Sequence, residues 1–192
     1  MSKEKTARKQ VRYELMKPVV ITGNPGTGKT TVGLGVAEAA GSERTDIDTC
    51  IEAIFGGKPL QDIYDGMGYY RFIAIEGFIA QWVFDSHSEP RFYTPGGSFN
   101  KSREAVQHYK DGGAVFVYLE DDLDTIMKAI RRRPRRGIAV QPGKTREQEL
   151  KDRIPLFEQD QNITIHVSGD RRRAAKELFK ILLEKGIICR RE

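Results

Sequence analysis

A glycine-rich segment at residues 23–30 carries the most specific chemistry in this chain. Its letters, GNPGTGKT, fit the pattern G-x-x-x-x-G-K-[ST] at every fixed position. Glycine lets a loop bend so that its backbone N–H groups point inward, where they can hold a polyphosphate. Lys29 would then reach the β- and γ-phosphates of ATP, and the Thr30 hydroxyl would bind Mg²⁺. The expected ATP-binding residues are Gly23, Asn24, Pro25, Gly26, Thr27, Gly28, Lys29, Thr30 and Thr31.

The segments on either side supply the elements that such a loop requires. Residues 18–22 (PVVIT) form a short β-branched run that predicts a buried strand, and residues 31–40 predict a helix. A strand, a glycine-rich loop and a helix in this order distinguish a phosphate-binding loop from a flexible loop with a chance lysine. The helix N-terminus adds partial positive charge where phosphate would lie.

Strand and helix signals alternate along the rest of the chain. This alternation predicts a parallel sheet with helices on both of its faces. Further strands are expected just before Asp46, over 91–94, over 114–119 and over 163–167. Helices are expected over 50–55, 60–64, 69–84, 103–110, 121–133 and 174–183, with one more beginning at a capping box at residue 145. The segment 134–144, with two prolines and two glycines, predicts a mobile lid.

Ligands of an open parallel sheet gather at the carboxyl ends of its strands. Asp46 and Asp48 end the second predicted strand, and Gly96 and Gly97 end the third. These residues can therefore converge with the phosphate loop although they are far apart in sequence. Asp46 and Asp48 could also be ordinary helix caps.

Composition sets the limits of the interpretation. The 192 residues fit one domain, which we expect over 18–192 behind a basic tail at 1–17. No apolar stretch approaches the roughly 18 residues of a membrane span. Two cysteines far apart in sequence favour a reducing cytoplasm. The net charge of +5 and the arginine runs at 131–136 and 171–173 allow a nucleic-acid partner, but no nucleic-acid-binding motif accompanies them.

The chain resembles the shikimate kinases, which have the fold of nucleoside-monophosphate-kinase-like P-loop proteins. The resemblance runs from about residue 18 to residue 185. Besides the phosphate loop, four segments match. DIDTCIE at 46–52 matches the family's D-x-D-x-x-I-E, and LQDIYDG at 60–66 with Tyr70 and Arg71 matches its I-x-x-I-F…G-E-x-x-F-R. PGG at 95–97 matches its glycine triplet, and DRIPLF at 152–157 matches its E-R-x-P-L-Y. The phosphate loop is shared by many families, whereas the other segments in this order are more specific.

The resemblance implies a three-layer α/β/α kinase with about five parallel strands, which uses ATP and Mg²⁺ to phosphorylate the 3-hydroxyl of shikimate. It implies that Asp48 orients or deprotonates the acceptor hydroxyl and that Asp46 holds Mg²⁺ through water. Arg71 and Arg153 would hold the acceptor carboxylate, although either could instead be a surface ion-pair partner. Gly96 and Gly97 would approach the acceptor through their backbone N–H groups. A lid arginine, Arg136, would reach the transferring phosphate.

The chain also departs from the family pattern, mostly in the acceptor half. Ser98 replaces the third glycine, and the glutamate expected three residues after Arg71 is Ala74, with Glu76 the nearest acid. The acceptor could therefore be another small hydroxylated acid or polyol. An alternative of another class is a P-loop ATPase or nucleotide-dependent regulator that binds nucleic acid. We expect a monomeric cytoplasmic enzyme with a small-molecule partner.

Overall fold

The computed structural model describes residues 12–132 and 138–191. Within these residues, five strands form one parallel sheet in the order β3-β4-β2-β5-β6. The strands are β2 (Val19–Thr22), β3 (Arg44–Asp46), β4 (Phe92–Thr94), β5 (Val115–Glu120) and β6 (Ile163–His166). The predicted parallel sheet of about five strands is therefore confirmed.

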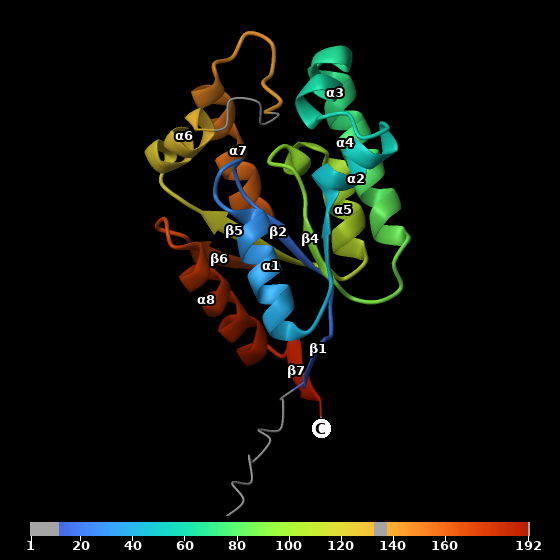
Figure 1. Cartoon of the computed structure of the whole chain (residues 1–192), viewed down its shortest axis with the longest axis vertical. Helices are drawn as coiled ribbons and strands as arrows, with labels where there is room; N and C mark the ends of the chain where they lie inside the picture. Colours follow the sequence, from blue (N-terminus) through green and yellow to red (C-terminus); the bar gives the residue numbers. More distant parts are fainter. Residues whose placement is uncertain (1–11, 133–137, 192) are drawn as a thin grey trace, which may run out of the picture.

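Helices cover both faces of this sheet (Figure 1). One face carries α1 (Lys29–Ala40) and α8 (Arg171–Glu184). The opposite face carries α2 (Ile47–Ile54), α3 (Leu60–Met67), α4 (Tyr69–Asp85), a short 3₁₀ helix η1 (Phe99–Lys101) and α5 (Arg103–Asp111). Helices α6 (Leu123–Arg131) and α7 (Arg146–Asp160) lie together at one end of the molecule.

The strand register explains how the two hydrophobic cores separate. Val20 pairs with Tyr93 on one side and Phe116 on the other, and all three side chains enter the core beneath α2, α4 and α5. Their neighbours Val19 and Ile21 point the opposite way, into the core beneath α1 and α8. Successive side chains of a strand alternate between faces, so a strand buried on both sides is apolar at every position.

A second, two-stranded sheet joins the two ends of the described chain. Strand β1 (Arg12–Leu15) pairs antiparallel with β7 (Ile188–Arg191), and Leu15 and Ile188 are buried beneath α1 and α8. The basic tail predicted for residues 1–17 is therefore too long, because its last residues belong to the fold. Residues 1–11 lie outside the described part, and the domain boundaries otherwise remain a prediction.

Most predicted elements are present, with small shifts at their ends. The predicted helix over 69–84 is α4, and the predicted restart at residue 145 is α7, which begins with a complete capping box between Thr145 and Gln148. No helix among the described residues is both long and apolar enough to cross a membrane.

Candidate active site

The phosphate loop lies between β2 and α1, as its sequence predicts. Gly23, Gly26 and Gly28 adopt φ values of 140°, 98° and 97°, a region that other residues rarely enter. A Cβ on Gly23 would also lie 2.6 Å from the carbonyl oxygen of Leu119 on β5. The glycines are thus required both for the turn of the loop and for its close packing on the sheet.

Lys29 folds back over this loop. Its Nζ is buried and donates hydrogen bonds to the carbonyl oxygens of Gly23 at 2.8 Å and Asn24 at 3.2 Å. Asn24 and Thr27 are buried as well, and the Asn24 amide donates to the Leu150 carbonyl on α7. The loop therefore surrounds the Lys29 ammonium group and is itself tied to α7.

Thr30 and Asp46 bring hard oxygen ligands together beside the loop. The Thr30 hydroxyl lies 3.3 Å from Asp46 Oδ2, which also accepts hydrogen bonds from Arg44 at 2.6 Å and Thr94 at 3.2 Å. Asp46 Oδ1 accepts from the Thr49 N–H, so Asp46 is the N-cap of α2, and its role at Mg²⁺ stays a prediction. The residues that the structure describes contain no cluster of three or more histidine, cysteine or acidic side chains suited to a metal. One hydroxyl and one carboxylate nevertheless fit Mg²⁺ in a phosphate site, where water and phosphate supply the other ligands.

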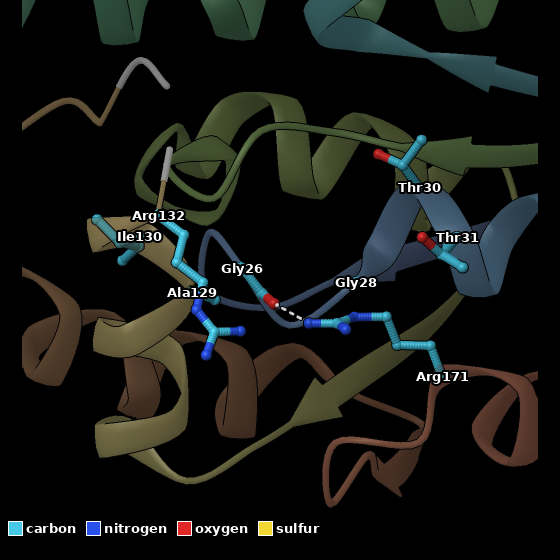
Figure 2. Close-up of a pocket in the computed structure, with 8 residues that line it drawn as sticks. All are labelled: Gly26, Gly28, Thr30, Thr31, Ala129, Ile130, Arg132 and Arg171. Carbon is cyan, nitrogen blue, oxygen red and sulfur yellow. Dashed lines mark hydrogen bonds between the residues drawn. The ribbon is translucent and has the colours of Figure 1, made fainter. Parts of the chain in front are cut away.

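A pocket of about 470 Å³ opens on the outer side of the phosphate loop (Figure 2). Thr30 and Thr31 line it from α1, and Ala129, Ile130 and Arg132 line it from the end of α6. Arg171, the first residue of α8, reaches across the loop and donates to the Gly26 carbonyl at 3.1 Å. A Cβ on Gly28 would lie 2.5 Å from the Arg171 side chain. The charged walls of this pocket suit the base and phosphates of a nucleotide.

Sequence reasoning assigned Arg171 to a surface basic run and did not place it in this pocket. The sequence could have predicted this position, because Arg171 follows β6 at the carboxyl edge of the sheet, where ligands of such sheets bind.

A second, smaller cavity lies on the other side of the loop. It holds about 10 Å³, which is room for about one water molecule. Among the predicted site residues, it is lined by Pro25, Lys29, Asp48, Gly96, Gly97 and Arg153. The structure thus brings together six residues that the sequence placed in one site.

Glu76 is the residue of this cavity that sequence reasoning missed. Its side chain is buried, and its Oε2 accepts a hydrogen bond of 2.6 Å from the Ser98 hydroxyl. Its Oε1 has no hydrogen-bond partner among the described residues. A Cβ on Gly96 would clash with this oxygen and would lie 2.8 Å from Asp48 Oδ1, so two carboxyl groups face the same glycine. Burial, and then the charge of Asp48, raise the pKa of Glu76 to about 7.

Arg153 also lines the cavity and is fully buried. Its Nε and Nη2 donate to Glu149 Oε1 at 3.2 and 3.1 Å, and Nη2 also donates to the Ala139 carbonyl. Its Nη1 faces Gly97, at 3.1 Å from where a Cβ of that glycine would be. Lys101 Nζ lies 2.9 Å from the same Glu149 oxygen. Two cations therefore share the Glu149 carboxylate, whose single negative charge cannot neutralise both.

Arg71 does not line the cavity, and we correct the prediction that it holds the acceptor. Its side chain is exposed on α4, whereas Phe72 and Glu76 of the same helix line the cavity. Each residue turns a helix by about 100°, so Arg71 and Glu76 point about 140° apart. The motif placed the arginine on the correct helix but on the wrong face.

The part of the predicted lid that the structure describes packs against the acceptor cavity. Ile138 and Ala139 are buried, and the Tyr64 hydroxyl donates to the Val140 carbonyl at 2.9 Å and accepts from the Val140 N–H at 3.2 Å. Arg136 lies outside the described residues, so its predicted contact with the transferring phosphate stays a prediction.

Comparisons with known proteins agree with this geometry. The family model of shikimate kinase matches residues 25–183 of the chain. A shikimate kinase from Salinispora arenicola is 32 % identical over 161 residues, which cover 80 % of this chain and 90 % of that protein. One from Thermobifida fusca is 29 % identical and covers 83 % of this chain and 91 % of that protein. The structure of a shikimate kinase from Acinetobacter baumannii in complex with shikimate has a TM-score of 0.76 and 24 % identity, covering 88 % of this chain and 95 % of that one. Similarity at that identity shows the shared fold.

Proposed function

The chain belongs to the shikimate kinase family, and from this premise we propose that it transfers the γ-phosphoryl group of ATP to the 3-hydroxyl of shikimate, forming ADP and 3-phosphoshikimate. It is a phosphotransferase with an alcohol acceptor. We also propose that it acts in the cytoplasm, as the sequence led us to expect.

The division of charge within the acceptor cavity carries this proposal. The carboxyl groups of Asp48 and Glu76 face Gly96, and the Arg153 guanidinium faces the next residue, Gly97. A carboxyl group suits a hydroxyl of the acceptor, and a guanidinium suits a carboxylate. A small molecule that carries both hydroxyls and a carboxylate, as shikimate does, complements both kinds of group.

The phosphate loop and Lys29 would bind the phosphates of ATP. Phosphoryl transfer depends mainly on positioning and on neutralising the charge of the transferring group. The Lys29 ammonium is already at the centre of the loop and would exchange its bonds to the Gly23 and Asn24 carbonyls for bonds to phosphate oxygens. Thr30 and, through water, Asp46 would hold Mg²⁺, which neutralises phosphate charge when bound.

In this proposal, Asp48 acts on the acceptor hydroxyl. It lies in the first turn of α2, two residues after the Asp46 cap, and it lines the cavity together with Lys29 of the phosphate loop. We propose that it orients this hydroxyl toward the γ-phosphate and accepts its proton. Glu76, held by Ser98, would orient a neighbouring hydroxyl, and a proton on Glu76 would let it donate as well as accept.

Arg132 and Arg171 would contact the nucleotide on the other side of the loop. This position gives Arg171 a role at ATP and removes it from the basic surface that suggested nucleic acid.

The test is ADP release by purified protein with Mg²⁺ and ATP, with and without shikimate, and ³¹P NMR of the product. We expect shikimate-dependent release and a new phosphomonoester. Lys29→Ala should abolish turnover, and Asp48→Asn should lower kcat by roughly 10²–10⁴-fold, the usual contribution of general-base assistance. If shikimate does not increase ADP release but another hydroxylated acid or a neutral polyol does, that compound is the acceptor and shikimate is not. Release without any acceptor would favour an ATPase.

A further inference from the structure

The outer face of α4 exposes large apolar side chains in the middle of a long helix. Phe78 is 70 % exposed and Trp82 is 57 % exposed. Ala74, one turn before Phe78, is also exposed and is small enough to let another helix approach closely. Figure 1 shows α4 at the edge of the molecule, with α2 and α5 on its inner side. Single exposed apolar residues are common on protein surfaces, but a Phe and a Trp in adjacent turns form a patch.

Opposite charges lie at the two ends of this face. Taking about 100° per residue, Arg71, Ala74, Trp82 and Asp85 all lie within about 40° of Phe78 around the helix. Arg71 forms no ion pair with any other residue that the structure describes. Asp85 uses Oδ1 to contact His108 Nε2 at 2.7 Å, and its side chain is 60 % exposed.

Phe78 is midway between the two charges. Arg71 precedes it by seven residues and Asp85 follows it by seven, a separation of about 10 Å along the axis in each direction. A two-fold axis through Phe78, perpendicular to the helix, would place a second α4 antiparallel to the first. Each Arg71 would then lie opposite Asp85 of the other copy, and each Trp82 would lie near Ala74. A face that matches itself in this way fits an isologous two-fold contact.

We propose that the outer face of α4 is a homodimer interface, in which two copies pack antiparallel about Phe78 with reciprocal Arg71–Asp85 ion pairs. This inference does not rest on the proposed catalytic function, because none of these residues lines the acceptor cavity or the nucleotide pocket. It also gives a role to Arg71, which the sequence had assigned to the acceptor.

The dimer should be reversible and of moderate affinity. A contact made mainly by one helix from each copy buries less than the roughly 1,600 Å² of a standard interface. We therefore expect a dissociation constant in about the micromolar range.

Sedimentation velocity over a micromolar concentration series tests the proposal, with the fluorescence of Trp82 as a second readout. Trp82 is the only tryptophan in the sequence. Its emission should shift to the blue as concentration rises, with the same midpoint as the sedimentation change. Phe78→Glu should make the protein monomeric, because two carboxylates would meet at the axis. Leu34→Glu is the matched control, since Leu34 is 48 % exposed on α1, away from α4, and this change should leave the dimer intact.

A charge swap then tests the geometry. Arg71→Glu alone would set two carboxylates against each other at both ends, and Asp85→Arg alone would do the same with two guanidinium groups. Each should weaken dimerisation at least about tenfold, because like charges across an interface repel. The double variant should regain most of the wild-type affinity. Circular dichroism and steady-state turnover should show that all five variants, Phe78→Glu and Leu34→Glu included, are folded.

Three results would overturn the proposal. The first is a wild-type protein that stays monomeric through the whole concentration series. The second is a dimer that persists unchanged in Phe78→Glu, because the interface would then lie elsewhere. The third is a double charge swap no better than either single variant, since the ion pairs would then not be reciprocal.

Discussion

Arg153 is the residue on which recognition of the acceptor carboxylate should depend. Removing its guanidinium from the cavity deletes a charge-assisted hydrogen bond, which is worth about 1.5–3 kcal/mol. We expect Arg153→Ala to raise KM for the acceptor roughly ten- to a hundredfold, with little change in KM for ATP. Arg71→Ala is the matched control and should leave both constants unchanged at a fixed state of association, because Arg71 is outside the cavity. Steady-state kinetics with each substrate varied in turn provides the measurement.

Arg153 is buried against Glu149, so loss of the guanidinium could also destabilise the fold. Arg153→Lys keeps the charge and separates the two effects. It should restore only part of the affinity, since one ammonium cannot contact Glu149, Ala139 and the acceptor together. A normal acceptor KM in a folded Arg153→Ala protein would contradict the assignment.

Glu76 should make the stability of the protein depend on pH. Burial and the charge of Asp48 raise its pKa from 4.5 to about 7, so between these values the folded protein holds a proton that the unfolded chain has released. The free energy of unfolding should therefore fall as pH rises from about 4.5 to about 7, by at most about 3 kcal/mol from this group. Glu76→Gln should remove this component. Urea unfolding of both proteins at several pH values measures the difference, and parallel pH profiles would show that Glu76 does not titrate in this window.

For individual residues, the sequence predicted the positions on the nucleotide side of the site better than those on the acceptor side. The phosphate loop is local, so spacing alone determines where Lys29 and Thr30 lie relative to each other. The acceptor side draws on α4, where a shift of a single position rotates a side chain by about 100°. The sequence pattern therefore selected Arg71 and passed over Glu76, although both are on the same helix.

Packing between elements can be tested at glycines inside helices. A Cβ on Gly77 of α4 would lie 2.7 Å from the Ser102 Cβ, where the helix meets the start of α5. Gly66 of α3 has nothing within 4 Å of the same position. Gly77→Ala should destabilise the protein, because overpacking costs about 1–3 kcal/mol. The higher helix propensity of alanine offsets part of this cost. Gly66→Ala should stabilise it by up to about 1 kcal/mol. Urea denaturation of both variants gives the comparison, and equal shifts would mean that α4 and α5 adjust to the methyl group.

The contact between α3 and the predicted lid can also be tested by a substitution. The acceptor cavity holds about 10 Å³, so part of its lining must move before an acceptor can enter, and Ala139 of the predicted lid belongs to that lining. Tyr64→Phe removes the hydroxyl that joins α3 to Val140. Amide exchange at Val140 should then accelerate about two- to tenfold, the equivalent of one hydrogen bond. Tyr13→Phe, at the β1 end of the molecule, should leave this exchange unchanged. An unaltered rate in Tyr64→Phe would mean that other contacts hold the segment.

The helices and the five parallel strands follow from local patterns, and their predicted ends differ from the structure by a few residues. Strands β1 and β7 could not be predicted in the same way. Their sequences, RYEL and ICRR, have no strong alternation, and each is a strand only because the other lies beside it. The residues of one strand give no information about a partner strand so far away in the sequence.

For the whole molecule, the β1–β7 pair has a consequence for synthesis in the cell. Roughly 170 residues separate the two strands, and a ribosome adds about 5–20 residues per second, so β1 waits about 10–35 seconds for its partner. During that time Leu15 has no Ile188 to cover it, and one side of the nascent core stays open to chaperones and to other chains. The core beneath α1 and α8 should therefore be completed only after β7 has been made, whereas the core beneath α2, α4 and α5 can form earlier in synthesis.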